Sequence, residues 1–198
     1  MIRCVVFDVG GVVFLPGTFR PIYQTIADRC RCRVEDIMLP IRLTWREWET
    51  GHISEREYFY QLSQLTEGEF SVHELKEMIY KKDHLNEELV GVISKLKEKV
   101  HVVALSNLAR EFYQHLWKEF DLHGLFHQEF TSFEIGVSKP YPEIYEHIMA
   151  ELGLDGKELL FFDDKEKGVN GAKAVGWNAF VYTDVKELKK VLLKFGLE

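Results

Sequence analysis

The sequence predicts an α/β protein, in which a doubly wound parallel sheet carries a helical segment inserted after the first strand. Short apolar runs alternate with amphipathic stretches in the second half of the chain, which is typical of parallel strands covered by helices on both faces. Between residues 17 and 83, strand signals are weak and helical periodicity dominates. A length of 198 residues accommodates one core domain with such an insertion.

Apolar, β-rich runs predict the strands of the core. The first run ends at Asp8, and the others cover residues 100–106, 158–162 and 178–182. Helical patterns lie between them at 86–99, at 142–152 and after Asp184. Pro142 suits a helix N-terminus, and Asp184 suits an N-cap.

The inserted segment contains three amphipathic stretches, at 21–30, 54–65 and 71–80. Two of them begin with the spacing of a capping box, in which a serine is followed three residues later by a glutamate: Ser54 with Glu57, and Ser71 with Glu74. We therefore assign residues 17–83 to a helical cap, and residues 1–16 and 84–198 to the Rossmann-like core.

Bulk properties narrow the class of protein. The formal net charge of −7 argues against a nucleic-acid surface. No apolar run approaches the about 20 residues that a membrane span needs. The three cysteines form no CxxC pair, which indicates free thiols in a reducing compartment, so we expect a cytoplasmic protein: Cys4, Cys30 and Cys32.

Polar residues stand where predicted strands stop: Asp8, Ser106 and Asp163. Ligands of doubly wound sheets bind beyond these carboxyl ends. Gly10 and Gly11 allow the backbone to approach a ligand, and Ser106 precedes a helix start whose N–H groups suit an anion. Lys139 adds a cation before Pro140, and Asp164 adds a third carboxylate.

This collection of charges indicates a metal-assisted site. Three carboxylates cannot all stay ionised close together without a cation, and hard oxygen ligands suit Mg²⁺. A metal beside a lysine and a hydroxyl suits a phosphorylated substrate. Each residue alone would be an ordinary turn or capping residue; their order, spacing and strand-end positions together favour the site.

The same stretches resemble the motifs of the haloacid dehalogenase superfamily, in the branch with a helical cap. "VVFDVGGVV" is similar to its first motif, "VVALSN" to its second, "GVSKPYPEIY" to its third and "LLFFDDKEKGVNGAKAVGW" to its fourth. The segment "WREWETGHIS" resembles a cap segment common in this branch. The resemblance covers essentially the whole chain.

The resemblance implies a role for each matching residue. Asp8 would be the nucleophile and form an aspartyl-phosphate. Ser106, the N–H of Asn107 and the Gly11 turn would bind the phosphoryl group, with Lys139 neutralising its charge. The same motifs imply four residues that would bind Mg²⁺: Asp8, Gly10 through its carbonyl, Asp163 and Asp164.

Gly10 departs from the usual pattern of the family. Most of its phosphatases have an aspartate two residues after the nucleophile, which protonates the leaving oxygen and then activates water. Glycine has no proton to give, although its carbonyl can still bind a metal. Glycine here also occurs in a branch that resembles sugar-phosphate phosphatases, and Glu49 or His52 of the cap are candidates to replace the acid.

Three functions remain open from the sequence. The first is a Mg²⁺-dependent phosphatase of a small phosphorylated metabolite, such as a sugar phosphate. The second is a phosphate-binding member that has lost its acid, and the third is a 2-haloacid dehalogenase, which needs no metal; a phosphomutase is a minor fourth. The sequence fixes neither the substrate nor the oligomeric state. Turnover is expected to open and close the cap at hinges near 16–17 and 83–86.

Overall fold

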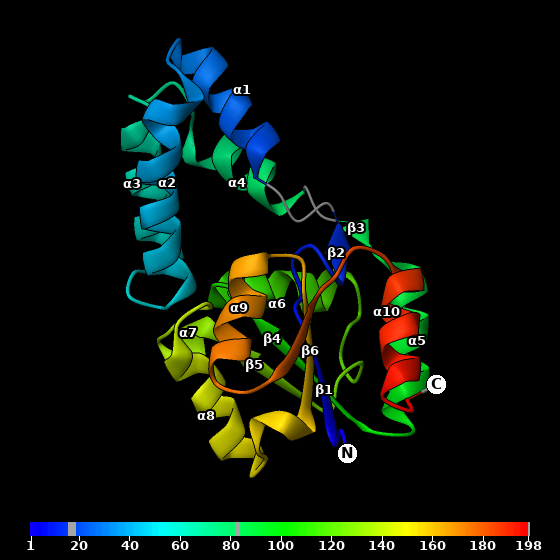
Figure 1. Ribbon diagram of the computed structural model, residues 1–198. Coiled ribbons are helices and arrows are strands. Elements are labelled where there is room, and N and C mark those ends of the chain that lie inside the picture. Colours follow the sequence, from blue (N-terminus) through cyan, green and yellow to red (C-terminus); the bar gives the residue numbers. More distant parts are fainter. Residues whose placement is uncertain (16–18, 82–83, 198) are drawn as a thin grey trace.

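The computed structural model describes residues 1–15, 19–81 and 84–197. Its main sheet has five parallel strands in the order β5–β4–β1–β6–β7 (Figure 1). These strands are β1 (Cys4–Phe7), β4 (His101–Ser106), β5 (Gln128–Thr131), β6 (Leu159–Asp163) and β7 (Asn178–Val181). The predicted α/β doubly wound fold is confirmed.

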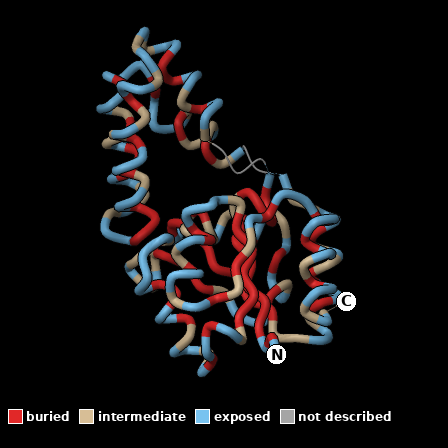
Figure 2. The backbone as a smooth tube through the Cα atoms, viewed as in Figure 1, coloured by how far each residue is buried: buried red, intermediate tan, exposed pale blue. Residues whose placement is uncertain are grey.

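Strand residues alternate between two apolar layers. Val5 and Phe7 of β1 belong to one core cluster, whereas Cys4 and Val6 belong to the other. Because side chains alternate along a strand, a strand buried on both faces has no polar positions, which explains the continuous apolar runs in the sequence. Figure 2 shows the strands as the most continuous buried part of the chain.

Helices cover both faces of the sheet. The Phe7 layer is closed by α5 (Glu87–Lys97), α6 (Arg110–Glu119) and α10 (Val185–Lys194). The Val6 layer is closed by α8 (Pro142–Leu152) and α9 (Glu166–Ala174), and two short turns of helix complete the core: α7 (Ser132–Ile135) and the 3₁₀ helix η1 (Gly156–Glu158).

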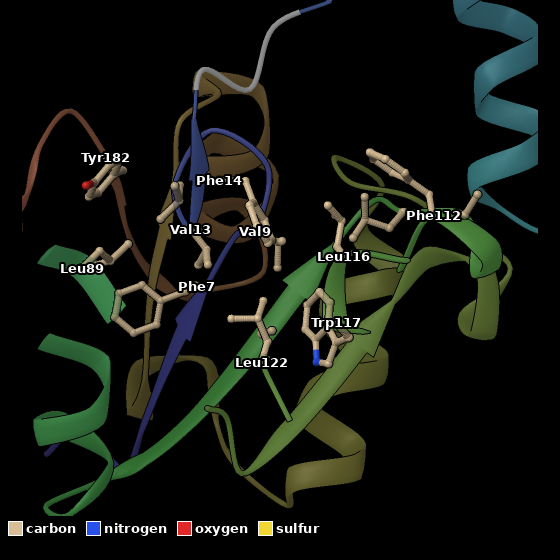
Figure 3. Close-up of a cluster of buried hydrophobic side chains, with 14 of the residues drawn as sticks. Phe7, Val9, Val13, Phe14, Leu89, Phe112, Leu116, Trp117, Leu122 and Tyr182 are labelled. Atoms are coloured by element: carbon tan, nitrogen blue, oxygen red, sulfur yellow. The ribbon is translucent and has the colours of Figure 1, made fainter. Parts of the chain in front are cut away.

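The first layer continues into the turn after β1. Figure 3 shows Val13 and Phe14 of this turn among the side chains of the same cluster as Phe7, Leu89 and Leu116. The ring of Phe14 also contacts Phe120, with 4.9 Å between their centroids. The turn that carries the glycines is therefore anchored in the core by its own apolar residues.

Within residues 19–81, the insertion has four helices: α1 (Arg20–Cys30), α2 (Val34–Glu49), α3 (Glu55–Leu65) and α4 (Val72–Tyr80). Both predicted capping boxes are confirmed, at Ser54 and Ser71. In Figure 1 this helical segment stands beyond the end of the sheet opposite the N-terminus. Aromatic rings pack between these helices: the ring of Trp48 stacks on that of Tyr58, with 4.5 Å between the ring centroids.

A two-stranded antiparallel sheet ties together the ends of the insertion. Strand β2 (Phe14–Leu15) pairs with β3 (His84–Leu85). Beside it, the amide of Asn86 donates to the carbonyl of Val13, and its side chain donates to the carbonyl of Val12 and to the hydroxyl of Tyr182. Of the hinge residues expected from the sequence, 16, 17 and 83 lie outside the described residues, and Asn86 is held by these bonds.

The three cysteines carry free thiols, and Cys4 is buried. Across the described ranges, we find no helix with the length and apolarity required to cross a bilayer. The boundaries of cap and core at residues 17–83, 1–16 and 84–198 stay a prediction.

Candidate active site

Three neighbouring strands bring the predicted polar residues to one edge of the sheet. Asp8 follows the last residue of β1, Ser106 ends β4 and Asp163 ends β6. Since β1 lies between β4 and β6, these residues converge at one place. All three are buried, and Asp8 is only 3% exposed.

Lys139 joins two of the carboxylates in a buried charge cluster, which we define as Asp8, Lys139 and Asp163. The Nζ atom of Lys139 lies 2.7 Å from Oδ1 of Asp8 and 2.8 Å from Oδ2 of Asp163. It also donates to the carbonyl of Leu105 at 3.2 Å. The same Oδ1 of Asp8 accepts the N–H of Val9 at 2.7 Å, which fixes the orientation of the carboxylate.

The charge cluster has more negative than positive charge, and this changes its protonation. Burial and the neighbouring charge of Asp163 raise the pKa of Asp8 to about 7, although Lys139 and Lys165 act in the opposite direction. Burial disfavours the ammonium form of Lys139, but the two carboxylates outweigh it and raise the pKa of Lys139. Lys139 therefore stays a cation, and a further cation near Asp8 would favour its ionised form.

Asn107 holds the main chain of Lys139 in place. Its Nδ2 donates to the carbonyl of Lys139 at 3.1 Å, and its Oδ1 accepts the amide of the same residue at 2.9 Å. From the sequence we expected the main-chain N–H of Asn107 to contact a phosphate. The bridge made by its side chain was missed, because it joins loops 32 residues apart.

Asp164 provides the strongest sign of a cation site. Its Oδ1 atom is buried and has no hydrogen-bond partner among the described residues, and Lys165 Nζ is 3.7 Å away. Oxygens of Asp8, Asp163 and Asp164 lie within 4.8 Å of one another. A buried carboxylate oxygen without a donor is costly unless a cation binds it, so these residues fit Mg²⁺.

Asp163 differs from Asp164 in its partners. Its Oδ2 faces Lys139, and its Oδ1 accepts the amide of Lys165 at 2.7 Å. Both of its oxygens therefore have donors within the protein. Its role as a metal ligand stays a prediction, whereas its contact with Lys139 is a feature of the structure.

Two glycines leave room for the aspartates. Gly11 has a φ of 89°, and a Cβ atom there would lie 2.4 Å from Cγ of Asp164. Its amide already donates to the carbonyl of Phe14 at 2.7 Å. The contact of Gly11 with a substrate stays a prediction. Gly168 of α9 leaves room for Asp163 in the same way, because a Cβ atom there would lie 2.3 Å from Oδ2 of Asp163. The sequence analysis did not single out Gly168.

Gly10 is different from Gly11. A Cβ atom at Gly10 would meet no atom within 4 Å, and its φ lies outside the left-handed region. The backbone therefore does not require glycine at this position, and the absence of a carboxyl group there is a chemical feature of the site.

The two predicted substitutes for this acid lie in different surroundings. Glu49, at the end of α2, is 8% exposed, and its Oε2 accepts the indole N–H of Trp45 at 2.7 Å. His52 is exposed and bonds the hydroxyl of Thr50 at 2.6 Å. It lines an outer cleft of about 530 Å³ together with Arg46 and Tyr141.

Known proteins are similar in sequence to this chain over most of its length. Residues 2–176 match the family model of haloacid dehalogenase-like hydrolases. The sesquiterpene phosphatase astK of Aspergillus oryzae is 29% identical over 188 residues, which covers 92% of this chain and 90% of astK.

Solved structures show the same fold at low identity. A haloacid dehalogenase family enzyme of Bacteroides thetaiotaomicron, in a mutant form with magnesium and inorganic phosphate, superposes with a TM-score of 0.80 at 21% identity, covering 95% of this chain and 99% of the other. L-2-haloacid dehalogenase of Xanthobacter autotrophicus has a TM-score of 0.66 at 20% identity, covering 100% and 85%. The fold alone therefore does not separate phosphatases from dehalogenases.

Proposed function

Because the chain belongs to the haloacid dehalogenase-like hydrolases, we propose that it is a Mg²⁺-dependent phosphatase of a small phosphorylated metabolite. The observation that carries this proposal is the buried, donor-free oxygen of Asp164 beside the charge cluster of Asp8 and Lys139. The dehalogenase reaction needs no metal, so an acidic cluster that fits Mg²⁺ favours the phosphatase reaction. The similarity to a phosphatase over most of both chains supports the same reaction.

In this mechanism Asp8 attacks phosphorus. The Val9 amide and Lys139 both contact Oδ1, so Oδ2 is the atom available to attack. The new Asp8 O–P bond forms as the bond to the leaving oxygen breaks and this oxygen takes up a proton, which gives an aspartyl-phosphate and an alcohol. A water molecule then loses a proton and attacks the phosphorus, the Asp8 O–P bond breaks, and Asp8 leaves as a carboxylate.

Three further residues position the phosphoryl group. We assign Ser106 and the main-chain N–H of Asn107 to phosphoryl oxygens, and Lys139 to the charge that develops on them. Asp8, Asp164 and the Gly10 carbonyl would hold Mg²⁺, with Asp163 next to them; when bound, the ion neutralises phosphate charge. Asp163 and Asn107 both keep Lys139 aligned.

The substrate class has two candidates. The sequence favours a sugar phosphate, whereas the similarity to astK adds a phosphorylated sesquiterpene alcohol. Partly exposed aromatic rings in the helical segment, at Phe19, Tyr23 and Trp45, would suit an apolar alcohol. Both classes therefore belong in one substrate panel.

Gly10 favours a second candidate, a protein that binds phosphate without hydrolysing it. A Cβ atom at Gly10 would meet no atom within 4 Å, so the backbone does not require glycine, and the missing carboxyl group has a chemical consequence. Retention of a buried Asp8–Lys139 pair argues for catalysis, because burying such charges is costly and binding alone does not require a nucleophile.

The test is phosphate release from sugar phosphates, prenyl and sesquiterpenyl phosphates and other small metabolites, with and without Mg²⁺. The proteins compared are wild type, Asp8→Asn and, as a matched control, the exposed Asp155→Asn. We expect release that needs Mg²⁺ and is lost only in Asp8→Asn. No release from any substrate, together with Mg²⁺-dependent binding of phosphate, would instead establish the binding protein.

A further inference from the structure

We propose that Glu49 is the catalytic acid and base that carries the proton which Gly10 cannot. This inference rests on the proposed phosphatase function and identifies a residue from the helical segment as part of the reaction.

The main chain of Glu49 is fastened to the phosphate-binding edge of the sheet. Its carbonyl accepts the hydroxyl of Ser132, and the same hydroxyl donates to the carbonyl of Leu108 at 3.4 Å. Leu108 stands two residues beyond Ser106, in the loop that follows β4. One hydroxyl thus links Glu49 to the loop that carries the predicted phosphate contacts.

Two tryptophans of α2 hold the same junction. Trp48 donates its indole N–H to Oε2 of Glu111 at 3.1 Å. The ring of Trp45 packs edge-on against Phe112, with 6.0 Å between the ring centroids. Glu111 and Phe112 lie in the first turn of α6, directly after the Ser106 loop. Trp45 also donates to Oε2 of Glu49, which fixes the orientation of its carboxyl group at this end of α2.

No other described acid of the helical segment is buried. Glu55 is partly buried, but its carboxylate is paired with Lys76 and accepts the hydroxyl of Tyr80, both in α4. Glu74 is half-buried and paired with Arg29. The remaining described acids of α1–α4 and the loops between them are exposed: Asp28, Glu35, Asp36, Glu47, Glu57, Glu67, Glu69 and Glu77. Glu49 is therefore the candidate that the described part of the segment offers.

Positive charges at the edge of the sheet, on Lys139 and Lys165, act on the carboxyl group of Glu49. Burial raises the pKa of Glu49 to about 7, while the Trp45 hydrogen bond and the positive charges of Lys165 and Lys139 lower it. Tyr23 of α1 and Arg46 of α2 are the other ionisable groups that interact with it or its surroundings. An acid whose pKa is close to neutral can both give and take a proton at pH 7.

The proton balance is complete within the two steps. When Asp8 attacks, protonated Glu49 gives its proton to the leaving oxygen, so an alcohol departs and Glu49 becomes a carboxylate. In the second step Glu49 takes a proton from the attacking water. The hydroxide adds to phosphorus, the Asp8 O–P bond breaks, and phosphate leaves with Glu49 protonated again.

The first test compares Glu49→Gln with Glu111→Gln on two substrates, an alkyl phosphate and 4-nitrophenyl phosphate. Both glutamates accept a tryptophan N–H at the same junction, so the second variant controls for disturbed packing. An alkoxide needs a proton to leave and nitrophenolate does not. We expect Glu49→Gln to lower the turnover of the alkyl phosphate by about 10² to 10⁴ and that of the aryl ester far less. Glu111→Gln should change both substrates by the same factor.

The second test moves the acid back to the position typical of the family. The Cβ atom of Gly10→Asp would meet no atom within 4 Å, and we expect the double variant Gly10→Asp, Glu49→Gln to recover alkyl phosphate turnover. Equal losses on both substrates in Glu49→Gln, or no loss at all, would overturn the role of Glu49 while wild type still releases phosphate. A wild type inactive on every substrate would overturn the phosphatase proposal and this inference together.

Discussion

At the scale of single residues, two adjacent glycines have different reasons to be glycine. Gly11 has a left-handed φ of 89° and lies against Asp164, so both its backbone and its lack of a side chain are required. Gly10 has neither constraint. The sequence shows "GG" at this point, and only the dihedral angles and the space around each residue distinguish the two.

We predict that Gly11→Ala lowers the free energy of unfolding by about 1 to 3 kcal/mol, because a Cβ in this conformation is strained and displaces Asp164. Mg²⁺ binding should weaken as well. Gly10→Ala is the matched control and should leave both quantities nearly unchanged. Urea unfolding and Mg²⁺ titration by calorimetry measure them, and equal effects of the two variants would refute the distinction.

Asn107 allows a second prediction at this scale. Asn107→Ala removes two hydrogen bonds to Lys139, so Lys139 loses its alignment and kcat should fall by up to about 10²-fold. Asn178 of β7 makes two comparable bonds, to the carbonyls of Lys157 and Leu159, away from the site. Asn178→Ala should reduce stability to a similar degree and leave kcat unchanged. A similar drop of kcat in both variants would show that the effect is only structural.

At the scale of elements, local signals predicted what local physics determines. The capping boxes at Ser54 and Ser71 and the Asp184 N-cap depend on residues three apart, and all three are confirmed. Helix α2 was not predicted as a helix, since Pro40 interrupts its pattern and only packing against α1 and α3 compensates for it. Strand β5 was missed because "QEFT" has no apolar run; its pairing with β4 makes it a strand.

Removing one cap tests how much local signals contribute. Ser54→Ala should lower the free energy of unfolding by about 1 kcal/mol, because the Glu57 amide loses its acceptor. Ser94→Ala serves as the control, since the Ser94 hydroxyl bonds a carbonyl inside α5 and adds little there. Chemical denaturation compares the two, and an equal loss in both would mean that the cap carries no special weight.

At the scale of the whole molecule, the site is assembled from parts far apart in the sequence. Strand-end residues could be predicted, because parallel strands bring their carboxyl ends to one edge whatever the loops do. The Asn107 bridge and the attachment of Glu49 at Ser132 could not, because they depend on where loops and the helical segment come to lie. The pairing of β2 with β3 also needs two short segments about 70 residues apart along the chain.

The pH dependence of stability is a property of this whole arrangement. Folding raises the pKa of Glu49 from 4.5 to about 7, so within this window the folded protein binds a proton that the unfolded chain has released. Stability from this group is complete below pH 4.5 and is lost as the pH rises to 7, by about 3 kcal/mol. Folding also raises the pKa of Asp8, but Asp8 is present in both wild type and Glu49→Gln, so its contribution is the same in the two proteins.

We therefore expect urea unfolding between pH 5 and pH 8, without metal, to show a larger loss of stability in wild type than in Glu49→Gln. The neutral amide has no proton to release, so its unfolding free energy lacks this contribution. Parallel curves for the two proteins would show that the Glu49 carboxyl is solvated like an ordinary surface acid.

Substrate-linked motion of the helical segment is the last expectation. If residues 17–83 act as a cap, Mg²⁺ with inorganic phosphate should slow hydrogen exchange at the end of α2, which the Ser132 hydroxyl links to the loop after Ser106. The amides of η1, at the opposite end of the sheet, provide the internal reference. Equal exchange in α2 with and without these ligands would refute the closing motion.

The small β2–β3 sheet has a consequence for how such a protein can change. Phe14 lies opposite Leu85 and Leu15 opposite His84, so the chain leaves the sheet domain and returns to it about 5 Å away. The segment between β2 and β3 is an insertion in the core. A two-residue turn could join the two strands in its place without shifting the register of any core strand. The inserted helices and the sheet that carries Asp8 can then be exchanged separately, so recombination at this pair of strands would join the same sheet to a different insertion.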